Sequence, residues 1–199
     1  MHWEKKGRIF EACGQNEWMN SYATVPTPHH LQNDLYRVYF STRDKLGRNQ
    51  VGYAEILFAD RVEVTKVSEV PVLGFGQLGH FDCDGVYGTS LVEAGDELRL
   101  YYAGWNAGLR GLFYSSIGVA VSHDGGESFQ RLGCSPILGR DEIDPWAVMA
   151  PYVLQVSDHH WVMWYVSGIE MSYDDSNNLK STYDVKTALS SDGLTWEKT

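Results

Sequence analysis

Hydrophobic and polar residues alternate in a pattern that recurs three times along the chain. Its clearest copy is the stretch 96–106, where apolar and polar side chains alternate before a Gly-Trp-Asn end, and similar stretches cover 34–43 and 160–168. Three aromatic positions of this pattern are spaced 63 residues apart: Tyr39, Tyr102 and Tyr165. Strict alternation of this kind, rich in Tyr, Val, Trp and Phe, predicts β-strands.

A second strand pattern follows each copy and keeps nearly the same spacing. It covers residues 51–54, 117–120 and 185–188, and each time it ends in alanine: Ala54, Ala120 and Ala188. A fixed period of this size indicates an array of similar supersecondary units, which bury their faces only against one another. No segment shows a long apolar period of 3.6 residues. We therefore predict an all-β fold, a β-propeller built from four-stranded units with the first strand innermost.

The repeats predict one partial propeller domain over 1–199. An N-terminal segment, 1–20, precedes three blades at 21–81, 82–143 and 144–199. In the second blade the four strands are expected near 86–92, 98–104, 116–122 and 128–132. The turn between its last two strands, and the corresponding turn in the third blade, resemble the Asp-box motif. Asp124 and Asp192 would there accept hydrogen bonds from their own turns, so we expect them to be structural.

Antiparallel strands sort the connections between two faces of the disc. The loops before the first strands and after the second strands share one face, at the mouth of the central channel. Eight candidate site residues fall on it: Arg43, Asp82, Asp84, Trp105, Asn106, Asp144, Trp146 and Glu170. A pocket in which several polar side chains converge is the default hypothesis for a ligand-binding site, so we expect the ligand to bind at this mouth. The two tryptophans suit either stacking on a sugar ring or packing between blades.

Charge and composition narrow the possible partners. The formal net charge is −10, from 16 basic and 26 acidic residues, which argues against nucleic acid and suits a neutral or cationic small ligand. Three widely spaced cysteines make no disulfide framework, and no signal peptide or membrane span is visible. We expect a cytoplasmic protein that binds neither membrane nor cofactor. The histidine pairs at 29–30 and 159–160 are expected to be solvated rather than metal ligands, and the sequence does not determine the oligomeric state.

Several motifs together resemble one family of enzymes. They are Tyr-Tyr-Ala-Gly-Trp-Asn at 101–106, Ser-Ile-Gly-Val-Ala at 116–120, the Asp-box-like turn and Ile-Asp-Pro-Trp at 143–146. In this arrangement the chain resembles the five-bladed propeller glycoside hydrolases, which include arabinanases, β-xylosidases, invertases and levansucrases. The resemblance implies a carbohydrate ligand or substrate. It also implies that Asp144 acts as the transition-state stabiliser or pKa modulator of that clan.

The chain departs from the clan's pattern at two catalytic positions. Ser21 stands where the clan has its base or nucleophile Asp, and the acid Glu would fall near position 207. Asp84 is then the candidate replacement for the base. About three of five blades are present, so we expect a fragment of a longer protein that is itself inactive. Two alternatives stay open: a glycan-binding propeller without catalysis, and a sialidase-type propeller, which would need an arginine cluster that Arg43 alone does not supply.

Overall fold

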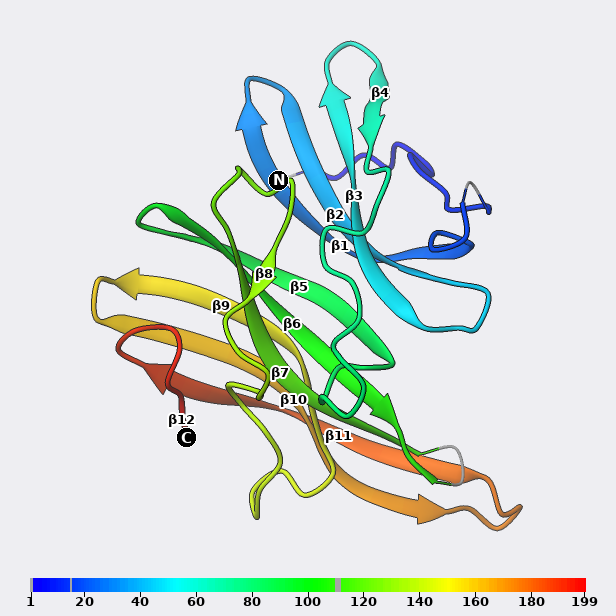
Figure 1. Cartoon of the computed structure of the whole chain (residues 1–199), viewed down its shortest axis with the longest axis vertical. Helices are drawn as coiled ribbons and strands as arrows, with labels where there is room; N and C mark the ends of the chain where they lie inside the picture. Colours follow the sequence, from blue (N-terminus) through cyan, green and yellow to red (C-terminus); the bar gives the residue numbers. More distant parts are fainter. Residues whose placement is uncertain (1, 15, 110–111) are drawn as a thin grey trace.

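Figure 1 shows the computed structural model of the chain, which describes residues 2–14, 16–109 and 112–199. These residues form twelve β-strands and no α-helix, as the alternating pattern predicts. No helix among them is long and apolar enough to cross a membrane. The strands follow one another through the sequence as antiparallel neighbours, in three groups of four.

Each group is a four-stranded antiparallel sheet. The first holds β1 (Ser21–Gln32), β2 (Leu35–Arg43), β3 (Asn49–Phe58) and β4 (Val62–Val67). The second holds β5 (Gly85–Ala94), β6 (Glu97–Ala107), β7 (Phe113–Ser122) and β8 (Gln130–Arg131). The third holds β9 (Ala147–Ser157), β10 (His160–Tyr173), β11 (Leu179–Ser190) and β12 (Glu197–Lys198).

The three sheets meet at their first strands and form an open arc, from the blue sheet to the orange one in Figure 1. Neighbouring sheets share a single parallel residue pair, Asn49 with Gly85 and Ser115 with Ala147. Strand β5 also contacts both β1 and β9, which places the first strands innermost. This is the predicted β-propeller architecture, with about three blades.

Strand register confirms one part of the predicted repeat and corrects another. Ala54, Ala120 and Ala188 are equivalent, because each pairs with the same position of its neighbouring strand. The same pairs show that Phe40, Tyr102 and Tyr165 are equivalent to one another, so the alignment of Tyr39 with Tyr102 is wrong. Tyr39 corresponds to Tyr101. The second copy carries two adjacent tyrosines, so a one-residue shift preserved the apparent match, although it moves side chains to the opposite face.

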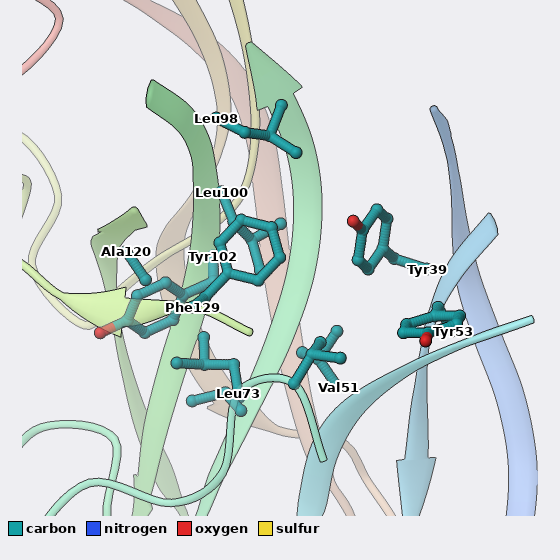
Figure 2. Packing of buried hydrophobic residues seen from close by; sticks show 11 residues of the cluster. Tyr39, Val51, Tyr53, Leu73, Leu98, Leu100, Tyr102, Ala120 and Phe129 are labelled. Atoms are coloured by element: carbon teal, nitrogen blue, oxygen red, sulfur yellow. The ribbon is translucent and has the colours of Figure 1, made fainter. Parts of the chain in front are cut away.

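Aromatic side chains fill the space between successive sheets. Figure 2 shows the cluster between the first two sheets, where Tyr39 and Tyr53 face Leu98, Leu100 and Phe129. A second cluster around Tyr101, Ile117, Trp161 and Met163 joins the second sheet to the third. The free face of the first sheet is covered differently, since Ala12 and Met19 of the N-terminal segment pack on Phe40, Ala54 and Ile56.

The turns predicted as Asp-boxes hold neighbouring sheets together. Tyr39 Oη donates to the carbonyl of Gly126 over 2.9 Å, and the equivalent Tyr101 Oη donates to that of Gly193 over 2.9 Å. Gly126 has a φ of 85°, and a Cβ there would overlap the Tyr39 hydroxyl. Glycine is therefore required for both the backbone conformation and the close approach.

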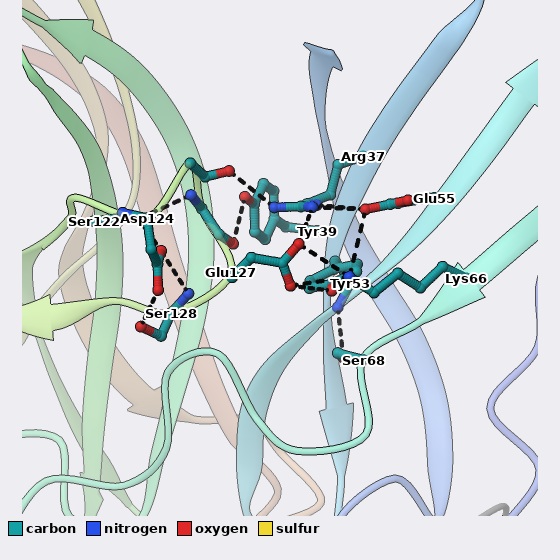
Figure 3. Close-up of polar contacts among 12 residues, drawn as sticks. Arg37, Tyr39, Tyr53, Glu55, Lys66, Ser68, Ser122, Asp124, Glu127 and Ser128 are labelled. Carbon is teal, nitrogen blue, oxygen red and sulfur yellow. Dashed lines mark hydrogen bonds and ion pairs between the residues drawn. The ribbon is translucent and has the colours of Figure 1, made fainter.

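A buried arginine strengthens the first of these contacts. Arg37 donates to the Gly125 carbonyl over 2.9 Å and pairs with Glu55 at 2.6 Å and Glu127 at 2.5 Å (Figure 3). Asp124 accepts hydrogen bonds from the side chains of Ser122 and Ser128 within its own turn. Burial would raise the pKa of Asp124, but these bonds outweigh it and lower the pKa to about 2.

Candidate functional site

A cavity of about 600 Å³ lies where the inner strands meet the ends of β2 and β6. Strands β1, β5 and β9 supply one part of its wall, and β6, β7 and the connection between them supply the rest. Most of the side chains that line it are apolar or aromatic. They include Val25, Tyr87, Trp105, Phe113, Met149 and Ala150.

The inner strands reach this cavity through matching β-bulges. In each, two residues lie opposite one residue of the neighbouring strand: 25–26 in β1, 88–89 in β5 and 150–151 in β9. Val25 and Ala150 adopt positive φ values of 55° and 50°. This conformation is costly for residues other than glycine, and most of all for a β-branched one. Both strained residues line the cavity, and bulges often redirect side chains next to functional sites.

Two of the eight predicted site residues, Arg43 and Trp105, line this cavity. They are equivalent, since they pair with the first residues of the inner strands, Ser21 and Gly85. The Arg43 guanidinium lies over the Tyr22 ring, 4.9 Å from its centroid. The Trp105 ring lies against Gly85, where any Cβ would overlap it, and its buried Nε1 has no hydrogen-bond partner within the described ranges.

Asp84 and Asn106 lie beside the cavity wall rather than in its lining. Asp84 Oδ2 accepts the backbone N–H of Ala107 over 2.7 Å, and Ala107 itself lines the cavity. Asn106 is paired with Tyr114 in the β6–β7 ladder. The carboxylate of Asp84 therefore fixes the backbone that forms part of the wall.

Asp82 is completely buried between the second sheet and the connection that leads into it. Its Oδ2 accepts hydrogen bonds from Tyr102 Oη at 3.0 Å and Arg131 Nε at 2.6 Å, while its Oδ1 has no partner among the described residues. Arg131 also donates to the Gly74 carbonyl at 2.5 Å. The carboxylate thus joins the last strand, β8, to the start of the same sheet.

Asp144 is equally buried and has four side-chain donors. They are Tyr165 Oη at 3.0 Å, Ser167 Oγ at 2.5 Å, Lys186 Nζ at 3.0 Å and Lys198 Nζ at 2.6 Å. Burial would raise the pKa of Asp144, but these donors, Lys198 first, lower it to about 2. Burial and the neighbouring Asp144 carboxylate raise the pKa of Tyr165. Asp144 is therefore ionised and fully hydrogen-bonded outside the cavity lining.

The two remaining candidates also lie outside the lining. The Trp146 ring packs against Phe113 and Tyr183, both with centroids at 5.4 Å, and lies over Gly168. Its side chain is thereby enclosed by protein. Glu170 is exposed on β10, where it pairs with Thr182 of β11.

Sequence analysis missed several residues that form the cavity wall, including Tyr87, Phe113, Ser115 and Met149. The alternation of apolar and polar residues shows which side chains of a strand point away from the core. It does not show which of those side chains line the channel. Among the described residues of the lining, Arg43 is the one charged side chain and there is no carboxylate. Nor do these residues contain a group of three or more His, Cys, Asp and Glu side chains that could hold a metal.

Two proteins of Mycobacterium tuberculosis are 35% identical to the chain over 198 residues. They are the uncharacterized proteins MT1551 of strain CDC 1551 / Oshkosh and Rv1502 of strain ATCC 25618 / H37Rv. The match covers 100% of this chain and 64% of each relative. The chain thus spans less than two thirds of the length of these relatives. No family model matches the sequence.

Glycoside hydrolases are among the solved structures with a similar fold. Zg3597, a family 117 glycoside hydrolase of Zobellia galactanivorans, superposes with a TM-score of 0.66 at 18% identity, over 89% of this chain and 55% of that protein. Sucrose-6-phosphate hydrolase from Lactobacillus gasseri gives 0.62 at 11% identity, over 92% and 34%. Exo-inulinase from Aspergillus awamori gives 0.57 at 15%, over 92% and 37%. The chain therefore has the propeller fold of these glycoside hydrolases.

Proposed function

We propose that the cavity at the ends of the inner strands binds a saccharide, as part of a carbohydrate-active, glycoside-hydrolase-like propeller. One observation carries this proposal: the Trp105 ring and the Arg43 guanidinium share a cavity of about 600 Å³ with further aromatic side chains. The likeness in fold to glycoside hydrolases supports it. A volume of this size is typical of small-ligand sites.

The cavity wall can contact both the apolar C–H face and the hydroxyl groups of a sugar ring. The apolar C–H face of a pyranose suits an aromatic surface, which Trp105, Tyr87 and Phe113 offer. The sugar hydroxyls need donors and acceptors. Within the described lining, the Arg43 guanidinium offers donors and the Ser115 hydroxyl can both donate and accept, whereas the Trp105 N–H is buried against Gly85.

Hydrolysis of a glycosidic bond needs catalytic groups that the described cavity lining does not contain. It requires two carboxylates placed on either side of the bond, and the described lining contains none. We therefore propose binding as the activity of this chain, and no hydrolysis by it. Catalysis by a longer protein remains the second candidate, favoured by the fold of the similar hydrolases. Roles for Asp144 and Asp84 in it remain predictions.

Titration calorimetry with a panel of aryl glycosides tests the binding site. Trp105→Ala should weaken the binding of any glycoside that binds by about 10-fold, because stacking on an aromatic ring contributes up to about 1.5 kcal/mol beyond buried area. Trp3→Ala is the matched control, since Trp3 is 85% exposed and outside the cavity. Equal affinities of Trp105→Ala and the wild type would refute the site.

A further inference from the structure

Arg43 differs from comparable arginines of the chain in having no carboxylate partner among the described residues. Within the described chain, the other arginines that are buried or half-buried each pair with a carboxylate at 2.5 to 3.2 Å: Arg37, Arg48, Arg99 and Arg131. Arg43 is half-buried too, but its described neighbours include no such carboxylate, and it rests on the Tyr22 ring instead. Among the described residues, none is given as an acceptor for its N–H donors, which can therefore meet a ligand in the cavity.

The surroundings of Arg43 make an anionic ligand group the best partner. A half-buried charge without a counter-ion is unfavourable, and the described lining offers Arg43 none. The planar guanidinium binds carboxylate, sulfate and phosphate groups through two parallel hydrogen bonds, which are stronger than bonds to neutral hydroxyls. Contact with such a ligand would supply Arg43 with the counter-ion that the described lining does not offer.

We propose that the cavity takes an acidic saccharide, whose anionic group pairs with Arg43 while its ring lies against the aromatic wall. This inference rests on the proposed saccharide site. The net charge of −10 favours neutral or cationic ligands at long range. However, salt screens charges beyond about 8 Å at physiological ionic strength, whereas Arg43 would touch the anionic group directly.

A matched pair of probes tests the charge requirement. 4-Nitrophenyl β-D-glucuronide and 4-nitrophenyl β-D-glucoside differ in one group, a carboxylate in place of a hydroxymethyl. Calorimetry should show about 10- to 100-fold tighter binding of the glucuronide, the usual worth of a hydrogen bond to a charged group. Glucose 6-sulfate and glucose 6-phosphate, measured in the same way, show which anion fits.

Substitutions at Arg43 connect the preference to this residue. Arg43→Gln should bind both probes with the weaker affinity of the glucoside, and Arg43→Lys should keep part of the preference because it keeps the charge. Arg61→Gln removes the same charge from an exposed residue outside the cavity, and it should behave as the wild type. Melting curves establish that each variant is folded.

The outcomes separate the two proposals. Glucuronide and glucoside affinities that are equal in the wild type would overturn the acidic ligand but leave a saccharide site. The same holds if Arg43→Gln weakens both probes alike. If no probe or panel glycoside binds to the wild type, both proposals fail.

Discussion

Asp82 and Asp144 occupy equivalent positions in the second and third sheets, yet their carboxylates accept different numbers of hydrogen bonds. Each accepts a hydrogen bond at 3.0 Å from an equivalent tyrosine, Tyr102 or Tyr165. Each also accepts one at 2.6 Å from a cation on the last strand of its sheet, Arg131 or Lys198. Asp144 has two more donors, whereas one oxygen of Asp82 has no partner in the part of the chain that the structure describes.

The shared part of this arrangement extends to the backbone. Arg131 donates to the Gly74 carbonyl and Lys198 to that of Gly139. These glycines follow equivalent residues, Leu73 and Leu138, which bridge to the third strand of the preceding sheet. The repeat therefore shows what the carboxylate does in both sheets: it fixes the short last strand to the start of its own sheet and to the connection before it. The extra donors at Asp144 are what distinguishes the position that the family resemblance implicates in catalysis.

The largest effect should follow removal of each carboxylate. We expect Asp82→Ala and Asp144→Ala each to lower the free energy of unfolding by roughly 3–5 kcal/mol, because each removes a buried carboxylate that accepts from a cation and from a tyrosine hydroxyl. Asp144→Ala should cost more, because it removes the acceptor of Tyr165, Ser167 and Lys186, whereas Asp82→Ala removes that of Tyr102 and Arg131. Lys198 still pairs with Asp141 at 2.7 Å in the first variant.

Denaturant unfolding measures both variants against Asp158→Ala. Asp158 is exposed in the turn between β9 and β10, so its removal should change stability by no more than about 0.5 kcal/mol. A greater loss for Asp82→Ala than for Asp144→Ala would contradict the ranking by donor number.

The sequence predicted the fold because the fold depends on repeated patterns. Alternation defined the strands, and the alanines aligned the sheets. The equivalence of Asp82 with Asp144 was less visible, because Asp84 stands two residues later and alternation gives both the same face. The partners decide between them: Tyr102 and Arg131 contact Asp82, while Asp84 binds the backbone of Ala107.

The cavity was predictable only in part. Arg43 and Trp105 were found because they end equivalent strands at the channel mouth. Tyr87 and Met149 were missed, because the bulges that follow them on the inner strands interrupt the period of two. The bulges contain Pro26, Gly88 and Pro151, and proline or glycine inside a strand often marks a bulge, so the sequence did carry a signal for their place. It carried none for their conformation, since two of the three have a positive φ on a residue other than glycine. Tertiary packing, rather than local preference, sets their conformation.

A smaller effect on the free energy of unfolding is expected when Asp144 is protonated at low pH. Its pKa is lowered to about 2 in the folded chain, against about 3.9 when unfolded. The stabilisation from the ionised group is thus complete above about pH 4 and is lost as the pH falls toward about 2, a change of roughly 2 kcal/mol. Asp144→Asn should remove this component from the pH dependence of unfolding.

Asp124 contributes in the same pH range, because its pKa is also about 2. The informative quantity is therefore the difference between Asp144→Asn and the wild type at each pH, with Asp158→Asn as the control. A constant difference from pH 5 to pH 2 would mean that the folded chain does not depress the pKa of Asp144.

Asp84→Asn should have the smallest effect, although Asp84 is only two residues from Asp82. Its carboxylate accepts one backbone N–H, from Ala107 in the cavity wall, and the amide oxygen of asparagine accepts the same bond without the charge. We expect a loss of about 1 kcal/mol or less in unfolding free energy, and a similarly small loss in glycoside binding. Denaturant unfolding and calorimetry, beside Asp158→Asn, measure the two quantities. A fall in glycoside affinity of more than about 10-fold without loss of stability would instead show Asp84 in contact with the ligand, the position that a replacement for the missing base requires.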